Sequence, residues 1–141
     1  MSFLFLDCQT TGMHPNLGHL LEIAWSDGST LESFLVELPE GEKIPRAVKL
    51  LTGITDLEGA LPVEKVREKF RAYLAARPAL SHAIIHYAQF EKPFLRAWLG
   101  EEFPLPIYCS HQIARRLHPE SPSRTVRGLL GYFGREAREI R

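Results

Sequence analysis

The order of the apolar segments constrains the fold more than any other feature of this sequence. Short apolar runs typical of buried strands come first, at residues 3–6, 20–25 and 31–38. Asp27-Gly28 is a tight-turn signal between the second and third runs, so these two strands are expected to form a hairpin. Strands and helices then alternate, which predicts a mixed α/β sheet.

The second part of the sequence carries the helical patterns, which proline and glycine residues separate. Helices are expected at residues 46–51, 62–77, 90–99, 110–117 and 125–133. Two further strands are expected, one at residues 83–85 and one in the short piece that ends at Tyr108. A length of 141 residues matches one domain with a single core.

Charge and cysteine content narrow the function classes only slightly. The net charge is zero, but residues 1–60 carry 3 basic and 9 acidic side chains, whereas residues 109–141 carry 7 and 3. This asymmetry fits a cation site beside a polyanion track, and it fits ordinary scatter of solvated charge equally well. Cys8 and Cys109 are expected to be free thiols in a reducing cytoplasm, and no spacing typical of a zinc site is present.

No segment of the sequence predicts a membrane location. The apolar runs are far shorter than a membrane span, and the N-terminal residues have no basic leader of the kind that opens a signal peptide. We therefore expect a cytoplasmic protein without membrane contact.

Asp7 is the first candidate for chemistry, because it lies where the first buried strand meets a polar loop. Open α/β sheets place their sites at such strand ends. Asp7 and Gln9 are two residues apart and share one face of an extended chain. Two carboxylates in this arrangement hold a hard divalent cation, but here the second position is an amide. A strand-end aspartate is also a common cap or turn residue.

Several collinear motifs carry a resemblance to one family. Residues 5–12, Phe-Leu-Asp-Cys-Gln-Thr-Thr-Gly, resemble the first motif of the DnaQ-like 3′–5′ exonucleases of the DEDD superfamily, in which an apolar strand leads into D-x-E-T-T-G. Further similar segments follow in the family's order, at residues 20–24, 51–55, 85–95 and 125–134. The resemblance implies a ribonuclease-H-like fold with a mixed five-stranded sheet, three antiparallel and then parallel strands, flanked by helices.

The resemblance also implies an activity. Carboxylates from three motifs of such enzymes hold two divalent metals, Mg²⁺ or Mn²⁺, that promote attack of hydroxide on the terminal phosphodiester. A histidine or tyrosine in the third motif is the general base. The expected substrate is the 3′ end of single-stranded DNA or RNA.

The residues of this chain keep only part of that set. Asp7 matches the first-motif aspartate and is expected to bind metal. Gln9 stands where the family has glutamate, so it is expected to be a weak, neutral ligand, which leaves one metal site weakened. Glu91 stands where the second motif has aspartate and keeps the charge of a ligand. Tyr87 stands where that motif has asparagine.

Substrate contacts are expected around the same strand ends. Thr10, Thr11 and Gly12 follow the first motif, and in the family such residues contact the 3′ end. His86 is a second candidate contact, with a satisfied core histidine as the alternative. Phe90 is a third, although its helical spacing from a second phenylalanine also fits the core. A strip of four arginines fits either a track for the phosphate backbone or a solvated helix face; these are Arg115, Arg116, Arg124 and Arg127.

The third motif is missing from residues 1–141, which contain no aspartate after Asp56. Two explanations remain open. The sequence is expected to stop before the last helix of a longer, multidomain protein, because residues 135–141 have the pattern of a helix without a stop signal. The alternative is a natural pseudo-nuclease that uses its cleft to bind nucleic acid or a partner protein.

Overall fold

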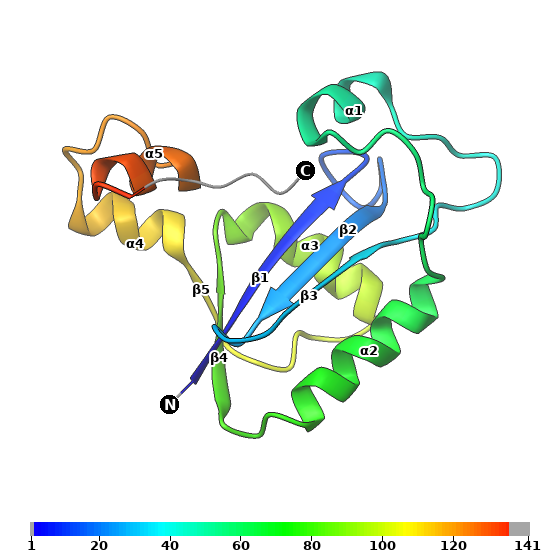
Figure 1. Cartoon of the computed structure of the whole chain (residues 1–141), viewed down its shortest axis with the longest axis horizontal. Coiled ribbons are helices and arrows are strands. Elements are labelled where there is room, and N and C mark those ends of the chain that lie inside the picture. Colours follow the sequence, from blue (N-terminus) through cyan, green and yellow to red (C-terminus); the bar gives the residue numbers. More distant parts are fainter. Residues whose placement is uncertain (1, 136–141) are drawn as a thin grey trace.

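The computed structural model describes residues 2–135 as a five-stranded mixed sheet with helices around it (Figure 1). The strands lie in the order β3-β2-β1-β4-β5. Their bounds are β1 Ser2–Thr10, β2 Leu20–Ser26, β3 Leu31–Leu35, β4 Leu80–Ile85 and β5 Ile107–Cys109. The helices are α1 Arg46–Thr52, α2 Val63–Ala75, α3 Ala88–Leu99, α4 Ser110–Leu117 and α5 Val126–Tyr132.

Strand directions confirm the predicted mixed sheet. β1 pairs antiparallel with β2, and β2 pairs antiparallel with β3 as the expected hairpin. β1 and β4 run parallel, as do β4 and β5. The parallel pairing brings the carboxyl end of β4, and the loop that follows it, next to the carboxyl end of β1. The two segments that resemble the first and second motifs therefore meet at one edge of the sheet.

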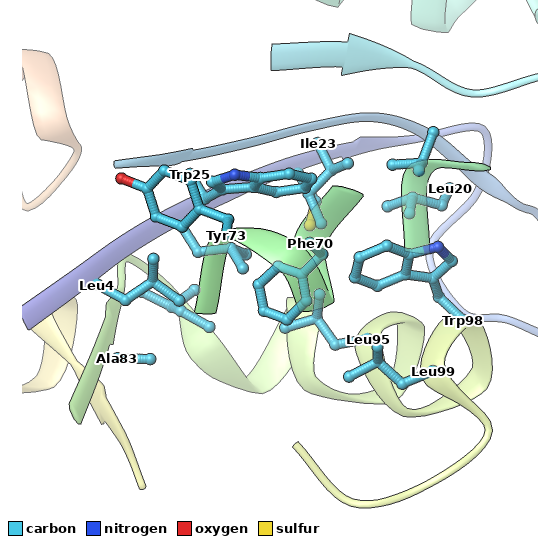
Figure 2. Close-up of a cluster of buried hydrophobic side chains, with 14 of the residues drawn as sticks. Leu4, Leu20, Ile23, Trp25, Phe70, Tyr73, Ala83, Leu95, Trp98 and Leu99 are labelled. Atoms are coloured by element: carbon cyan, nitrogen blue, oxygen red, sulfur yellow. The ribbon is translucent and has the colours of Figure 1, made fainter. Parts of the chain in front are cut away.

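The core lies between the sheet and helices α2 and α3. Alternation along β1 sends Leu4, Leu6 and Cys8 into this core, while residues 5, 7 and 9 face the other side of the sheet. Phe70 of α2 is fully buried at the centre, with ring centroids 5.1 Å from Trp25 and 5.4 Å from Trp98 (Figure 2). This packing fixes the position of α3, which carries Glu91.

The β2–β3 turn is anchored to α2 by a polar cluster. Asp27 Oδ1 accepts hydrogen bonds from the backbone amides of Ser29 and Thr30 at 2.9 and 2.8 Å. Asp27 Oδ2 accepts from Arg77 Nε at 2.9 Å. These hydrogen bonds hold the pKa of Asp27 far below its usual range. The cluster is remote from the end of β1 and has a structural role.

The structure corrects some of the expected boundaries. β3 ends at Leu35 rather than residue 38, and the next residue makes an isolated bridge to Leu61. α3 starts two residues before the expected position 90. α5 stops at Tyr132, because Gly134 adopts a left-handed backbone and Arg135 N donates to the Leu130 carbonyl at 2.7 Å.

Arg135 is therefore not helical, contrary to the continuous helix expected over residues 135–141. The remainder of that segment lies outside the described residues. Among the residues described, no helix is long and apolar enough to span a membrane.

Candidate active site at the end of β1

Asp7 and Glu91 come together at the carboxyl end of β1. Asp7 is solvent-exposed on the face of the sheet that lies opposite α2 and α3. Glu91 lies in the first turn of α3 and is buried, with only 3% of its surface exposed. The two carboxylates are close enough for the charge of Asp7 to raise the pKa of Glu91. The pair predicted as metal ligands thus shares one place in the fold.

Burial removes solvent from the Glu91 carboxylate, and the surrounding protein groups replace that solvation only in part. Loss of solvation is the main reason that its pKa rises from 4.5 to about 8, and the neighbouring Asp7 charge adds to this rise. Hydrogen bonds from the thiol and backbone of Cys8 oppose it. Oε1 is buried and has no hydrogen-bond partner among residues 2–135. A buried carboxylate oxygen without a partner is energetically costly unless a cation neutralises it.

We predict that the stability of the metal-free protein falls between pH 4.5 and pH 8. Glu91 is ionised in the unfolded chain throughout this interval but stays protonated in the fold, so the unfolded state binds fewer protons. The loss approaches about 1.4 kcal/mol per pH unit, the value of one pKa unit of differential interaction. Urea unfolding in EDTA measures it, and Glu91→Gln is expected to flatten the pH profile. Equal slopes for the two proteins would contradict this prediction.

Gln9 occupies the position next to Asp7 on the same face of β1, half-buried. Its partner directly across the antiparallel ladder is Glu22 on β2. Residues opposite each other in such a ladder have neighbouring side chains, about 4.5–5.5 Å apart at Cβ. The neutral amide of Gln9 therefore avoids placing a second negative charge beside Glu22. It also leaves the site with one carboxylate fewer than the family pattern.

The loop after β1 is held by its own threonines and glycines. Thr10 Oγ1 donates to the Gly12 carbonyl at 2.7 Å. Thr11 Oγ1 accepts from the His19 amide at 2.8 Å, and the Thr11 amide donates to the His19 carbonyl. A Cβ atom at Gly12 would lie 2.7 Å from the Leu17 carbonyl oxygen, so this close approach of two backbone segments requires glycine. Thr10, Thr11 and Gly12 thus build the rim of the site, and their contact with a substrate stays a prediction.

His86 follows β4 and has both ring nitrogens engaged. Nε2 lies 2.6 Å from the Arg124 carbonyl oxygen, which only accepts, so Nε2 carries the proton. Nδ1 is then the acceptor for the Ser110 hydroxyl at 2.9 Å. Neither nitrogen is available to abstract a proton, so any contact of His86 with a substrate is limited to its ring. This arrangement agrees with the satisfied histidine considered as the alternative.

A hollow of about 490 Å³ lies beside these residues. Asp7, His86 and Ser110 line it together with apolar side chains of the sheet and Val126 of α5. Phe90, by contrast, does not line it; its ring centroid lies 5.5 Å from that of Phe94 on the next turn of α3.

Two structural relations escaped the sequence reasoning. Cys8 is buried against Glu91, and burial together with the Glu91 and Asp7 charges raises the pKa of its thiol, which stays protonated as a donor. Ser110, in the first turn of α4, is the second hydrogen-bond partner of His86, whose tautomer the Arg124 carbonyl fixes. The alternation of β1 indicated that Cys8 is buried, but no sequence signal placed it beside a carboxylate 83 positions away.

The residues present fit one divalent cation better than two. Two carboxylates converge here, one of them a buried group with an orphan oxygen, and oxygen ligands suit Mg²⁺ or Mn²⁺. Within residues 2–135, however, no group of three or more histidine, cysteine, aspartate or glutamate side chains has the arrangement of a complete metal site.

The sheet order and the strand-end carboxylates define an α/β domain of the ribonuclease-H-like class. Comparison with known proteins identifies relatives of the chain that are consistent with this class. The chain is 24% identical over 144 residues to DNA polymerase III subunit epsilon of Aquifex aeolicus, covering 99% of this chain and 71% of that protein. It is 30% identical over 125 residues to a PolC-type DNA polymerase III of Thermotoga petrophila, covering 82% of this chain and 9% of that protein.

Solved structures agree on the fold. Escherichia coli exonuclease I in complex with a 5cy-dT13 oligonucleotide superimposes with a TM-score of 0.76 at 17% identity, over 99% of this chain and 37% of the other. A product-bound exonuclease I gives 0.78 at 18% identity, over 99% and 40%. No family model matches the sequence. The resemblance to DnaQ-like 3′–5′ exonuclease domains is thereby confirmed, although the chain spans well under half of the exonuclease I chains and a small part of PolC.

Proposed function

We propose that this chain is a 3′–5′ exonuclease-type domain that acts on the 3′ end of single-stranded DNA or RNA with Mg²⁺ or Mn²⁺. The observation that carries the proposal is the buried Glu91 carboxylate, with its orphan oxygen, beside Asp7 at the end of β1. Such a pair is unfavourable by itself and becomes favourable around a dication. The similarity to polymerase-associated exonuclease domains supports the same activity.

Each residue of the site has a definable task in this proposal. Asp7 is exposed at the surface and supplies a charged metal ligand where the 3′ end of the nucleic acid would bind. Glu91 supplies a second charge from the first turn of α3. Gln9 offers an amide oxygen without charge. When bound, divalent cations activate water and stabilise negative charge on the phosphoryl group, and a site short of one carboxylate holds them more weakly. We therefore expect slow hydrolysis from residues 1–141.

The polarity of strand shortening tests this proposal. An oligonucleotide labelled at its 5′ end is incubated with the protein and Mn²⁺, in parallel with the same strand labelled at its 3′ end. Attack from the 3′ end shortens the 5′-labelled strand in single-nucleotide steps and releases the 3′ label as a mononucleotide at once. The opposite pattern, or cleavage of a circular single strand, would exclude the proposed activity. Running DNA and RNA strands side by side shows which sugar is accepted.

The lack of a third charged ligand among residues 2–135 favours a second candidate, a catalytically inactive domain that binds nucleic acid or a partner protein. Gln9 and the incomplete set of metal-binding side chains in residues 2–135 are the observations behind it. Such a domain binds a single strand equally well with EDTA and with Mn²⁺, and it leaves the strand intact.

A further inference from the structure

Tyr87 has an unusual backbone conformation at the rim of the site. It is the N-cap of α3, with φ 62° and ψ 50°, and is the only non-glycine residue among those described with a positive φ. A left-handed backbone costs an ordinary L-residue about 1–2 kcal/mol, and asparagine or glycine tolerates it best. The side chain does not recover this cost through burial, because Tyr87 is 55% exposed. The residue type at this position therefore requires another explanation.

The Tyr87 ring belongs to a fixed aromatic pair. Its centroid lies 4.4 Å from that of His111 in the first turn of α4, at an interplanar angle of 57°. His111 in turn contacts His86 edge-on, with centroids 5.5 Å apart. Both nitrogens of His86 are bonded to neighbouring groups, so this ring holds His111 in place. The pair is thus an exposed tyrosine ring against a half-buried histidine that has rigid support.

The surroundings of this pair are cationic. Burial and the neighbouring His86, Arg124 and Arg115 side chains lower the pKa of His111, which favours the neutral form of its ring. Arg115 lies one helical turn after His111 on the same face of α4. Between residues 2 and 135, neither Arg115 nor Arg124 forms an ion pair with a carboxylate. Arg115 is exposed, and Arg124, which is half-buried and donates Nη2 to the Pro119 carbonyl at 3.1 Å, keeps a positive charge that no carboxylate of the described residues neutralises.

The pair also has a defined position relative to Asp7. His86 and Ser110, the residues that precede Tyr87 and His111 in the chain, both line the hollow that contains Asp7. The aromatic pair consequently stands on the β4–β5 side of this hollow. Successive aromatic and cationic groups along a groove are the features that bind single strands without sequence preference, because every base has a π-face.

We propose that Tyr87 and His111 form a stacking platform for a nucleobase of the strand whose 3′ end is bound at Asp7, with Arg115 and Arg124 facing its phosphates. This inference rests on the proposed function and adds a binding subsite to it. The platform favours single strands, because a base inside a duplex is already stacked on both faces by its neighbours and has no face free for the Tyr87 ring. On this proposal, the base-stacking role of the Tyr87 ring explains why a tyrosine occupies this strained backbone position.

Substitution of Tyr87 separates binding from folding. Affinity is measured by fluorescence anisotropy with a 5′-fluorescein oligothymidylate in EDTA, where no strand is cleaved. Tyr87→Asn is expected to weaken binding about 5- to 150-fold, since one stacked base contributes roughly 1–3 kcal/mol. The same variant is expected to unfold at an equal or higher temperature than the parent, because asparagine accepts the left-handed backbone. Tyr87→Phe keeps the ring and is expected to keep the affinity.

Further variants cover the partner ring and the charges. His111→Phe is expected to bind as the parent does, whereas His111→Leu is expected to bind more weakly. Arg115→Gln is expected to reduce the salt dependence of binding, and Arg71→Gln, which removes an arginine from α2, is the control without effect.

Unchanged affinity in Tyr87→Asn would overturn the platform, and so would an equal loss in Tyr87→Phe, because either result removes the ring face from binding. If Tyr87→Asn binds normally while the parent protein still shortens strands from the 3′ end, only the platform fails. If the parent binds no single strand and cleaves none, the proposed function fails as well.

Discussion

Asp7→Ala is expected to abolish metal-dependent shortening of a 5′-labelled single strand. The substitution removes the exposed charged ligand and leaves Glu91, a buried group with its pKa raised to about 8, as the remaining carboxylate of the pair. Loss of several kcal/mol of metal-based transition-state stabilisation corresponds to roughly a thousandfold in rate, at about 1.4 kcal/mol per tenfold. Initial rates in Mn²⁺ measure the effect.

The control for this substitution is Glu68→Ala. Glu68 is an exposed acidic residue of α2 with a loose ion pair to Lys65 at 3.9 Å, so the variant loses one negative charge away from the site. Its rate is expected to equal that of the parent. A rate in Asp7→Ala within a few-fold of the Glu68→Ala rate would show that hydrolysis does not depend on the end of β1.

Gln9→Glu is expected to increase the rate of hydrolysis by about 10- to 100-fold, a gain of roughly 1.4–2.7 kcal/mol in transition-state stabilisation. The new carboxylate shares the face of β1 with Asp7 and restores the charge that the family pattern has at this position. Without metal it faces Glu22 across the ladder, so the variant is expected to be less stable than the parent in EDTA. Mn²⁺ is expected to reverse this difference, because it neutralises the added charge.

Gln89→Glu provides the matched addition of charge. Gln89 is exposed on α3 and does not line the hollow beside Asp7. If Gln9→Glu and Gln89→Glu increase the rate of hydrolysis equally, the increase reflects general electrostatics and not a restored metal ligand. If Gln9→Glu gains nothing while its metal affinity rises, the amide at position 9 is not what limits the reaction.

The sheet was predictable because it follows from local patterns, whereas the grouping of Asp7 with Glu91 was expected from the resemblance to the DnaQ-like motifs. The apolar run that ends at Asp7 predicted β1 and its polar carboxyl end, and the parallel arrangement with β4 then placed the first turn of α3 beside it. The extent of β3 was not predictable in the same way. Val36 still donates its N–H to the Leu21 carbonyl of β2 at 2.9 Å, but regular pairing ends there and Val36 makes an isolated bridge to Leu61.

Other features of the site depend on contacts between distant segments, which a single sequence does not reveal. Cys8 reaches Glu91, and Ser110 bonds to His86, only because the sheet brings β1, β4 and α4 together. The left-handed backbone of Tyr87 contradicts the ordinary preference of tyrosine, so residue propensity predicts the opposite. The sequence thus indicated which residues gather at the strand end, but not which of them are buried, bonded or strained.

Direct measurement of metal binding tests the central claim that Asp7 and Glu91 together hold a divalent cation. Free Mn²⁺ is followed by electron paramagnetic resonance during titration of the parent protein and of Asp7→Ala, Glu91→Gln and Glu68→Ala. The account predicts saturable binding by the parent and by Glu68→Ala, with at least a tenfold weaker affinity in the two site variants. Equal binding by all four proteins, or none by the parent, would contradict the claim and favour a domain that binds nucleic acid or a partner without a metal.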